Sequence, residues 1–489
     1  KNMPEVSDVS WALFEALGSR KLYDASVRRA GESVVLMARE EDTGRDVLAA
    51  AGPAAAAFQG QALDGLTGVL APLTGDNAAA LRRLFPFTAP VSVLRQPRSI
   101  GLGDRLGIAT PGHIRALAGY DAYPVFAQQS IRELTLTGRT FADVLDAASF
   151  SVFRAGFERG FGFDGDHLKT EAEVADALAA GCTMITLDCS EYIRSGPPVR
   201  TETVPEALRV RYAGRRFHLS DTVTVAFDEK TLADCHRIYG EALDFAAAIY
   251  DRFLRDKTDR VDFELSIDET ATPTTPEQHF FVANELALRD VRPVTAAPRF
   301  CGEFQKGVDY IGDLNQFAAE LDAHAAIAAH FGYKLSIHSG SDKFSVFPAI
   351  GRATQGRFHV KTAGTNWLSA MQVVAETDPA LYRAAHKHAL ARFADARKYY
   401  HVTTDLGNIP DLNTLADSDL PALFDNNDAR QLIHITYGYL LTDKAPNGAP
   451  LLRDRLYALW DKERELYAQH LAQHIGKHLS LLYGDRPHA

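Results

Sequence analysis

From about residue 91 onward, short apolar runs alternate with longer stretches in which apolar residues have helical spacing. This alternation is typical of βα units and a parallel sheet, because each strand needs a crossover that returns the chain to the same edge. The predicted strands are residues 91–94, 123–127, 160–164, 184–187, 261–267, 300–304, 334–337 and 358–361. We therefore expect an α/β fold, a (β/α)8 barrel of TIM type.

The predicted strand at residues 261–267 shows the clearest alternation of apolar and polar side chains. Its apolar set is Phe263, Leu265 and Ile267, and its polar set is Asp262, Glu264, Ser266 and Asp268. Because strand side chains alternate faces, the apolar set should lie under the helices and the polar set should face the barrel interior. Barrel interiors are normally filled by branched apolar residues, so a polar row indicates a functional site near the strand's carboxyl end.

The rest of the chain is divided by the same patterns. Residues 1–90 are expected to form a small mixed α/β segment, with a helix at 11–17 and a strand at 33–39. Residues 91–370 are expected to form the barrel, interrupted by an insertion at about 195–260 that contains a strand-like, Arg-rich piece at 209–212. Residues 371–489 are mostly helical in pattern and are expected to pack on the barrel as an extension.

Composition and charge narrow the class of protein. Hydrophobic residues make up 46% of the chain, and the net charge is -11, which argues against nucleic acid as a partner but allows a small anionic ligand in a local cationic pocket. Four cysteines without a CxxC pair are no disulfide framework.

The sequence shows neither a signal-peptide pattern nor an apolar run of membrane-spanning length, so we expect a cytoplasmic protein with no membrane partner. A homo-oligomer is compatible with these properties.

Polar clusters follow the predicted strands, and in a barrel such positions meet at the carboxyl-terminal mouth. Two of the clusters contain a histidine, His167 and His338. Imidazole together with an oxygen donor suits a divalent cation such as Zn, Mn, Co or Ni, so we expect a metal site between these histidines. The residue types leave the third ligand open; the candidates are Gln305, Glu303, Asp268 and Glu269.

Other polar residues near the same strand ends are expected to bind the substrate. Lys169, Lys343 and Lys361 are cations that could hold a carboxylate. Gln128, Asp188 and Glu303 complete the expected substrate-binding set.

The sequence around these residues resembles the tagaturonate epimerase family of hexuronate catabolism over most of the chain. The resemblance is carried by residues 165–169 (GDHLK), 266–276 (SIDETATPTTP), 302–307 (GEFQKG), 336–344 (SIHSGSDKF) and 359–365 (HVKTAGT). It implies a metal-dependent isomerase that interconverts the keto-hexuronates D-tagaturonate and D-fructuronate, with side activity on tagatose and fructose. Carried onto this chain, it implies Asp166 and Glu269 as acid/base residues and His167 and His338 as metal ligands, to which we add Gln305 as the third.

The chemistry of this reaction favours a particular route. The two keto-uronates differ at a carbon β to the ketone, so the proton on that carbon is not acidified by an adjacent carbonyl. Transient oxidation would need a nicotinamide, for which the sequence shows no binding fingerprint. A retro-aldol step, rotation of the aldehyde and re-formation of the bond needs only Lewis-acid and acid/base groups, which match the residue types found.

Two alternatives remain open at this level. A retaining glycoside hydrolase would pair Glu264 or Glu269 with Glu303, with the carboxyl groups roughly 5–5.5 Å apart and no metal. A non-catalytic sugar-acid-binding barrel would also explain a polar mouth, because fold does not fix function.

Overall fold

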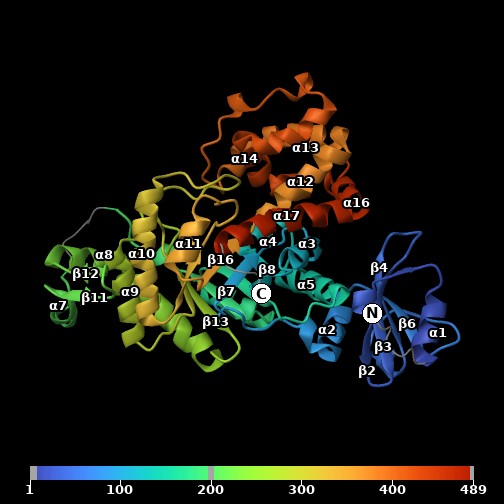
Figure 1. Cartoon of the computed structure of the whole chain (residues 1–489), viewed down its shortest axis with the longest axis horizontal. Coiled ribbons are helices and arrows are strands. Elements are labelled where there is room, and N and C mark those ends of the chain that lie inside the picture. Colours follow the sequence, from blue (N-terminus) through green and yellow to red (C-terminus); the bar gives the residue numbers. More distant parts are fainter. Residues whose placement is uncertain (1–7, 197–202, 485–489) are drawn as a thin grey trace.

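Within the parts of the chain that the computed structural model describes, residues 8–196 and 203–484, eight parallel strands close into a barrel (Figure 1). Neighbouring strands follow one another in the order β10, β13, β14, β15, β16, β7, β8 and β9, and β9 closes the barrel by pairing with β10. Their bounds are β7 Arg98–Leu102, β8 Tyr123–Ser130, β9 Gly162–Leu168, β10 Met184–Asp188, β13 Asp262–Ser266, β14 Thr295–Ala297, β15 Lys334–Ile337 and β16 Phe358–Thr362. The predicted TIM-type fold is confirmed.

Helices between the strands cover the outside of the barrel. Their bounds are α3 Thr110–Ala116, α4 Ile131–Thr137, α5 Phe141–Ala155, α6 Glu171–Ala179, α8 Glu229–Ile249, α9 Pro276–Leu288, α10 Leu314–Phe331 and α11 Phe347–Ala353. Capping boxes begin four of these helices, with Ser130, Thr140, Thr170 and Thr275 as N-caps. Because a cap satisfies the free amide groups of the first turn, it fixes where the helix starts and where the loop before it ends.

The alternation along β13 agrees with the prediction. Phe263 points outward, where its ring centroid lies 5.4 Å from that of Tyr250. Glu264, on the opposite face, is 0% exposed and lies among polar side chains inside the barrel. The barrel interior at this level is therefore polar rather than filled by branched apolar residues.

The first barrel strand lies later in the chain than predicted. Residues 91–94 form no strand; β7 is Arg98–Leu102. The Ser92 hydroxyl donates to the Asp262 carboxylate at 2.6 Å, the Leu94 amide donates to it at 2.9 Å, and Val93 packs in a small cluster with Val125. The apolar pattern at 91–94 thus reflects a plug at the amino-terminal end of the barrel.

The sixth strand also differs from the prediction. The strand expected at residues 300–304 is a loop, and β14 is the short run Thr295–Ala297. Its small residues give a weak strand signal, while Phe300 and Phe304 pack against Phe317 of α10, with ring centroids 5.4 and 6.0 Å away. Residues 302–307 therefore belong to the loop at the mouth, and Glu303 and Gln305 do not share a strand face.

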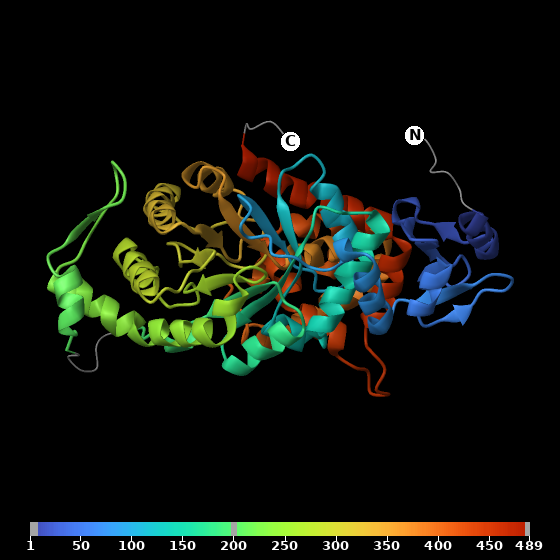
Figure 2. The ribbon, with the colours of Figure 1, turned by 90° about the horizontal axis from the view of Figure 1, so that it is seen from below.

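An antiparallel sheet precedes the barrel. It consists of β1 Lys21–Leu22, β2 Arg28–Ala30, β3 Ser33–Arg39, β4 Asp46–Ala51, β5 Gln61–Ala62 and β6 Gly68–Pro72, with α1 Asp8–Leu17 and α2 Gly75–Leu84. β3 is buried on both faces because Leu36 packs with Leu13 and Leu17 of α1, while Met37 packs in a cluster that includes Phe153 of the barrel helix α5. This sheet lies at one end of the molecule in Figures 1 and 2.

An arm built from the insertion between β10 and β13 extends at the opposite end (Figure 2). It contains α7 Glu206–Tyr212 and a hairpin of β11 Arg216–His218 and β12 Thr224–Ala226, before α8 leads back to the barrel. The strand-like piece expected at 209–212 is part of α7, and this expectation was wrong. Tyr212 is 0% exposed while Val210 is 64% exposed, so the apolar residues are arranged for a helix and not for a half-buried strand.

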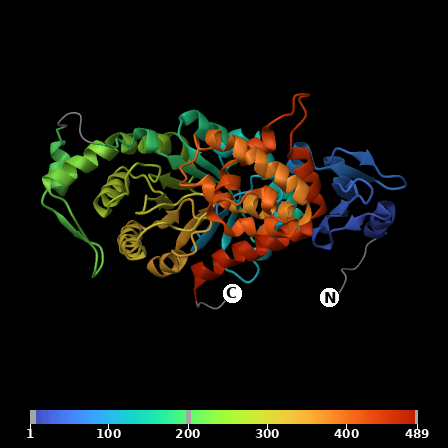
Figure 3. The ribbon, with the colours of Figure 1, turned by 90° about the horizontal axis from the view of Figure 1, so that it is seen from above.

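Helices from the end of the chain lie over part of the barrel (Figure 3). Their bounds are α12 Thr365–Thr377, α13 Pro379–Ala396, α14 Asn427–Ile435, α15 Tyr437–Thr442, α16 Arg453–Lys462 and α17 Arg464–Tyr483. They share an apolar core in which the rings of Trp367 and Trp460 lie 5.9 Å apart, and α17 packs along α3 and α11. Among the described residues, no helix is long and apolar enough to cross a membrane.

Candidate active site

A cavity of about 610 Å³ opens at the carboxyl-terminal mouth of the barrel. Its walls come from the loops after β8, β9, β13, β14, β15 and β16, and from the C-terminal helical region. The polar side chains that line it include Gln128, Arg132, Glu133, Asp166, His167, Lys169, Asp268, Glu269, Glu303, Gln305, Lys306, His338, Ser339, Lys361 and Tyr400. The polar clusters predicted at the strand ends therefore do meet in one place.

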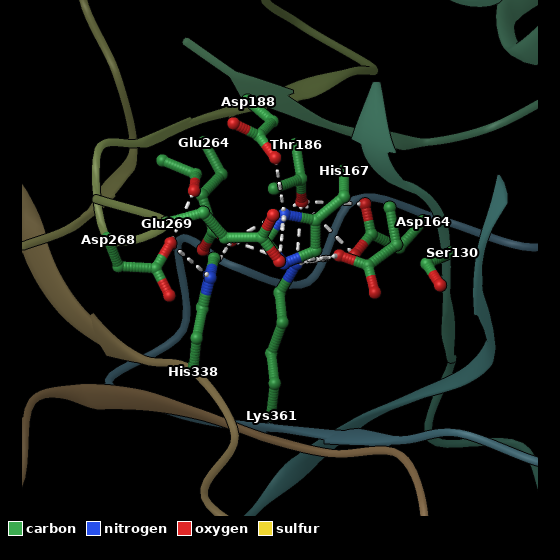
Figure 4. A network of polar contacts seen from close by, with 12 residues as sticks. Ser130, Asp164, His167, Thr186, Asp188, Glu264, Asp268, Glu269, His338 and Lys361 are labelled. Carbon is green, nitrogen blue, oxygen red and sulfur yellow. Dashed lines mark hydrogen bonds and ion pairs between the residues drawn. The ribbon is translucent and has the colours of Figure 1, made fainter. Parts of the chain in front are cut away.

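The floor of the cavity is an ionic network centred on Lys361 of β16 (Figure 4). Its ammonium group lies 2.6 Å from Asp166, 2.8 Å from Asp164 and 2.9 Å from Glu264, and donates to the Thr186 hydroxyl at 2.6 Å. Burial alone would lower the pKa of Lys361, but these carboxylates outweigh it and hold the pKa well above its usual value. Lys361 thus remains charged although its side chain is only 4% exposed.

A β-bulge brings Asp166 and His167 to the mouth together. On β10, Ile185 pairs with Gly165 and Leu187 pairs with Leu168, so the two residues between them on β9 oppose one on β10. His167 adopts a left-handed φ of 54° at this point. A bulge re-aims side chains that would otherwise point to opposite faces, and here both neighbours line the cavity.

The two histidines face each other across the cavity, with ring centroids 5.0 Å apart. His338 has its Nε2 2.7 Å from Glu264 and its Nδ1 3.1 Å from Asp268, while the Nδ1 of His167 is 3.1 Å from Asp188. Burial alone would lower the pKa of both rings. Asp166 is the largest opposing influence on His167, whose pKa rises to about 9, and Asp268 is the largest on His338, whose pKa rises to about 10.

These residues fit a bound divalent cation. Ligand atoms of His167, Asp268 and His338 all lie within 4.8 Å of one another, and the surrounding carboxylates favour positive charge at this place. Each histidine also has a carboxylate at a ring nitrogen, Asp188 for His167 and Glu264 for His338, as is common around metal-binding histidines. A second group, His167 with Asp188 and Glu269, meets the same distance criterion.

Gln305 is a poor third ligand in this arrangement. Its Oε1 accepts hydrogen bonds from the amide and the hydroxyl of Thr403 at 2.9 and 3.0 Å, and from the side-chain amide of Gln431 at 3.1 Å. The oxygen that would bind a cation is therefore already used. The Nε2 of Gln305, which can only donate, is buried and has no partner among the described residues. Among the candidates that the sequence left open, Asp268 has a carboxylate oxygen within 4.8 Å of ligand atoms of both histidines.

The three lysines predicted to hold a carboxylate have different surroundings. Lys343 is buried and donates to three backbone carbonyls, those of Gln305, Val308 and Ser341, at 2.7–2.8 Å. All its protons are thus used by the fold, so the expectation that it binds substrate does not fit. Lys361 is likewise engaged by the floor network, and the ammonium of Lys169 lies 3.6 Å from Asp188 and 3.8 Å from Glu269.

The remaining predicted residues differ in access to the cavity. Gln128 lines it, is 1% exposed and has no partner for its amide atoms among the described residues. A Cβ on Gly101 would lie 1.9 Å from its Oε1, so glycine there is what gives this side chain room. Glu303 also lines the cavity, with 41% of its side chain exposed. Asp188 does not line it; it is buried and orients His167.

Two cations at the cavity, Arg132 and Lys306, are not among the predicted site residues. Arg132 follows the end of β8 by two residues, and Lys306 follows Gln305 directly. Their positions after strand ends are the signal that could have identified them. A lone cation after a strand end is more often a solvated charge, so no pattern along the chain favours these two residues.

Comparison with known proteins agrees with this site. The family model described as UxaE, tagaturonate epimerase, matches residues 23–482. The chain belongs to the tagaturonate epimerase family. It is an isomerase of the epimerase type, as the resemblance in its sequence implied.

Individual members of the tagaturonate epimerase family are similar along almost the whole chain. A tagaturonate/fructuronate epimerase from Thermotoga maritima is 41% identical over 479 residues, which is 95% of this chain and 97% of that protein. The native crystal structure of a fructuronate-tagaturonate epimerase from Cohnella laeviribosi is 46% identical, covers 97% of this chain and 99% of its own, and superposes with a TM-score of 0.93. The crystal structure of the same epimerase with one glycerol bound is 47% identical, covers 97% of this chain and 99% of its own, and superposes with a TM-score of 0.92.

Proposed function

We propose that this protein interconverts D-tagaturonate and D-fructuronate with the help of a divalent cation held by His167, Asp268 and His338. The observation that carries the proposal is the convergence of these three ligand groups at the mouth of a barrel whose family acts on tagaturonate. Zn, Mn, Co and Ni all suit two imidazoles and a carboxylate. A cation bound there would supply Lewis-acid polarisation of the substrate ketone.

Asp166 and Glu269 are proposed as the groups that exchange protons with the substrate. They lie on opposite sides of the His167 ring: Asp166 is 3.9 Å from Nε2, and Glu269 is 4.0 Å from Nδ1. Burial opposes ionisation of Asp166, but Lys361 outweighs it and holds the pKa of this carboxyl below its usual value, so Asp166 is present as the carboxylate, the form that an acceptor needs. Two proton-transfer groups on two sides suit a reaction that inverts a carbon.

A retro-aldol route uses these groups without proton removal at carbon. One carboxylate accepts the proton of the hydroxyl on the carbon to be inverted, and the C–C bond next to that carbon breaks, with its electrons passing toward the ketone. The aldehyde fragment turns, the bond re-forms on its other face, and the second carboxylic acid returns a proton to the new hydroxyl. Side activity on tagatose and fructose would follow the same steps, because their ketone and hydroxyl groups are arranged alike.

The glycoside-hydrolase alternative in which Glu264 is one of the two carboxylates fits the site less well. Glu264 lies on the floor with Oε1 engaged by His338 and Lys361 and Oε2 accepting from Thr295 at 2.6 Å. A carboxylate committed in this way is not available to attack a sugar.

The function is tested by a coupled assay on tagaturonate with the purified protein, before and after treatment with a chelator. We expect formation of fructuronate, its loss on chelation and its return when a divalent cation is added. Turnover that persists in metal-free protein would refute the metal-dependent proposal, and absence of turnover with every cation would refute the reaction.

The acid/base roles are tested by the variants Asp166→Asn and Glu269→Gln. Each should retain the metal and lower kcat by roughly 10²-fold or more, the usual scale for a positioned acid or base. Asp176→Asn, an exposed position on α6, is the matched control. Near-normal rates in both site variants would remove these residues from the reaction.

The route is tested with substrate deuterated at the inverted carbon. Retro-aldol chemistry keeps the label through many turnovers in ordinary water. Washout of the label would mean deprotonation at carbon, and retention together with a tightly bound nicotinamide would favour transient oxidation instead.

A further inference from the structure

A cationic corner of the cavity has no role in the chemistry described so far. We propose that Lys306 and Arg132 form a carboxylate subsite that holds the acidic end of the substrate and selects keto-uronates over neutral ketoses. This inference rests on the proposed function, since it assigns the part of the substrate that does not react.

Lys306 is placed to meet an anion. It lines the cavity, is half-buried and makes no ion pair among the described residues; its ammonium donates only to the Ser339 hydroxyl, at 3.2 Å. Ser339 directly follows the proposed ligand His338, so Lys306 belongs to the same cavity as the proposed metal site. Burial lowers the pKa of Lys306, and an incoming carboxylate would offset that cost.

Arg132 stands at the same corner. Its guanidinium is 3.6 Å from the carboxylate of Glu269, a distance that leaves room for closer acceptors, and it lies over the ring of Tyr400 at 5.3 Å. A guanidinium supported by an aromatic ring keeps its planar array of donors in a fixed orientation. That array suits bidentate recognition of a carboxylate.

Two carboxylates lie near these cations, and among the described residues neither makes an ion pair with Lys306. Glu133 lines the cavity, but its Oε1 accepts from buried Arg105 at 2.7 Å, and its Oε2 accepts from the Ser130 amide at 3.3 Å. Its negative charge is therefore shared with Arg105 and with the cap of α4. Glu269 lies 3.6 Å from Arg132, so Lys306 is the cation of this corner that an incoming carboxylate would neutralise.

The cavity thus offers groups of both charges. Carboxylates surround His167 and His338 and favour a cation there, whereas Lys306 and Arg132 are cations that favour an anion. An open-chain keto-uronate carries both a ketone and a carboxylate. The charges match this substrate class and do not match a neutral ketose, which offers no anion to Lys306 and Arg132.

The experiment compares D-tagaturonate with D-tagatose, which has a hydroxymethyl group in place of the carboxylate. Each sugar is measured as substrate, and tagatose also as a competitive inhibitor, with the metal-loaded wild type and the variants Lys306→Met, Arg132→Met and Lys306→Arg. We expect each methionine variant to lower kcat/KM for tagaturonate by roughly 10- to 100-fold, mainly through KM, the range for losing a hydrogen bond to a charged group. In Lys306→Met the constants for tagatose should change by no more than about 3-fold, and Lys306→Arg should recover most of the loss. Arg132→Met also removes the cation beside Glu269, so it is compared through KM and binding rather than through kcat.

Lys230→Met is the matched control, because Lys230 lies on α8, has a side chain that is 89% exposed and does not line the cavity. It should leave the ratio of tagaturonate to tagatose unchanged. Equal losses for both sugars in the Lys306 and Arg132 variants, or no loss for tagaturonate, would overturn the subsite.

The affinity of the same proteins for each sugar, measured by calorimetry, distinguishes failure of the subsite from failure of the proposed reaction. If wild type fails to turn over tagaturonate but binds it more tightly than tagatose, and Lys306→Met abolishes that preference, the subsite stands and the reaction fails. Equal binding of the two sugars by wild type overturns the subsite. Thermal unfolding of each variant shows that it is folded, and Arg132→Met provides the test if Lys306→Met is not.

Discussion

At the scale of single residues, the site is a set of buried charges that depend on one another. Lys361 is surrounded by Asp164, Asp166 and Glu264, and Glu264 in turn holds His338. Removing one member of such a network leaves its partners buried and uncompensated, which costs more than the interaction contributes. The arrangement therefore fixes the positions of Asp166 and His338 before any substrate arrives.

The His338→Ala variant is expected to lower the metal content of the purified protein as well as its activity. The ring supplies one of three convergent ligand groups, and two remaining ligands hold a cation weakly. Elemental analysis of protein purified in parallel measures the occupancy. His388→Ala, whose ring pairs with Asp443 in the C-terminal helical region, is the control and should keep the metal. Full occupancy in His338→Ala would show that the cation lies elsewhere.

Lys334, at the opposite end of the barrel, should make stability depend on pH. Burial lowers its pKa to about 7, against the partial opposition of Asp262. Above pH 7 and up to about pH 10, the unfolded chain then binds a proton that the folded protein does not. The free energy of unfolding should rise with pH in this window by up to about 1.4 kcal/mol per pH unit.

The Lys334→Met variant should lack this rise. Urea unfolding at pH 7, 8 and 9 measures it, as the difference between the variant and wild type. Lys398→Met changes a lysine whose side chain is 73% exposed and should follow wild type. Parallel profiles for Lys334→Met and wild type would contradict the assignment.

At the scale of elements, the C-terminal helices hold the loop that follows β15. The Asp342 carboxylate in this loop is 3.0 Å from Arg430 of α14 and also accepts from His474 of α17, while the Asp342 amide donates to His478 at 3.0 Å. Ser339 and Asp342 both have left-handed φ, 50° and 64°, which is unfavourable for these residues unless the surroundings impose it. The helices thus keep His338 and Ser339 in place from outside the barrel.

Arg430→Met should weaken this support. We expect the free energy of unfolding to fall by about 1–3 kcal/mol, because His474 still pairs with the buried Asp342. Metal affinity, measured by competition with a chelator, should fall as well, since the loop carries a ligand. Arg392→Met, which removes the pairs to Asp395 and Asp443, is the control and should leave metal affinity unchanged. Loss of stability with undiminished metal affinity would limit Arg430 to a structural role.

How much the sequence could predict depends on the element. β15 and β8 have clear apolar runs between turn signals and were located closely, and with them His338 and Gln128. β14 is a short strand of small residues, so the stronger aromatic pattern after it predicts a strand there instead, whereas Gln305 lies in a loop and bonds to Thr403. The partners of Lys343 are backbone carbonyls, which no pattern of side chains reveals.

At the scale of the whole molecule, the barrel lies between an antiparallel sheet at one end and an arm at the other, with helices over part of its mouth (Figures 1 and 3). The division of the chain at residues 90 and 370 stays a prediction, as does a homo-oligomeric state. Bonds from Gln305 to Thr403 and from Arg430 to Asp342 cross from the barrel to the C-terminal helices. Because these bonds surround the cavity, a ligand bound there should stabilise both parts together.

Removal of the metal should therefore lower the thermal midpoint of the entire protein in a single transition. At a free cation concentration of about 100 times Kd, bound metal contributes roughly 2.7 kcal/mol to the folded state. Calorimetry with added cation and with chelator measures the shift. A transition that splits, with only one part responding to metal, would show that the barrel and the helices unfold separately.

The distance along the chain between the two sides of the Asp342 contact has a consequence for biosynthesis. His474 and His478 come 132 and 136 residues after Asp342, near the end of the last described helix. While the ribosome is still adding α17, the barrel strands have already emerged, but the loop after β15 lacks the groups that hold it. The nascent chain should thus hold the proposed cation site in place only once α17 has left the ribosome and packed against the barrel.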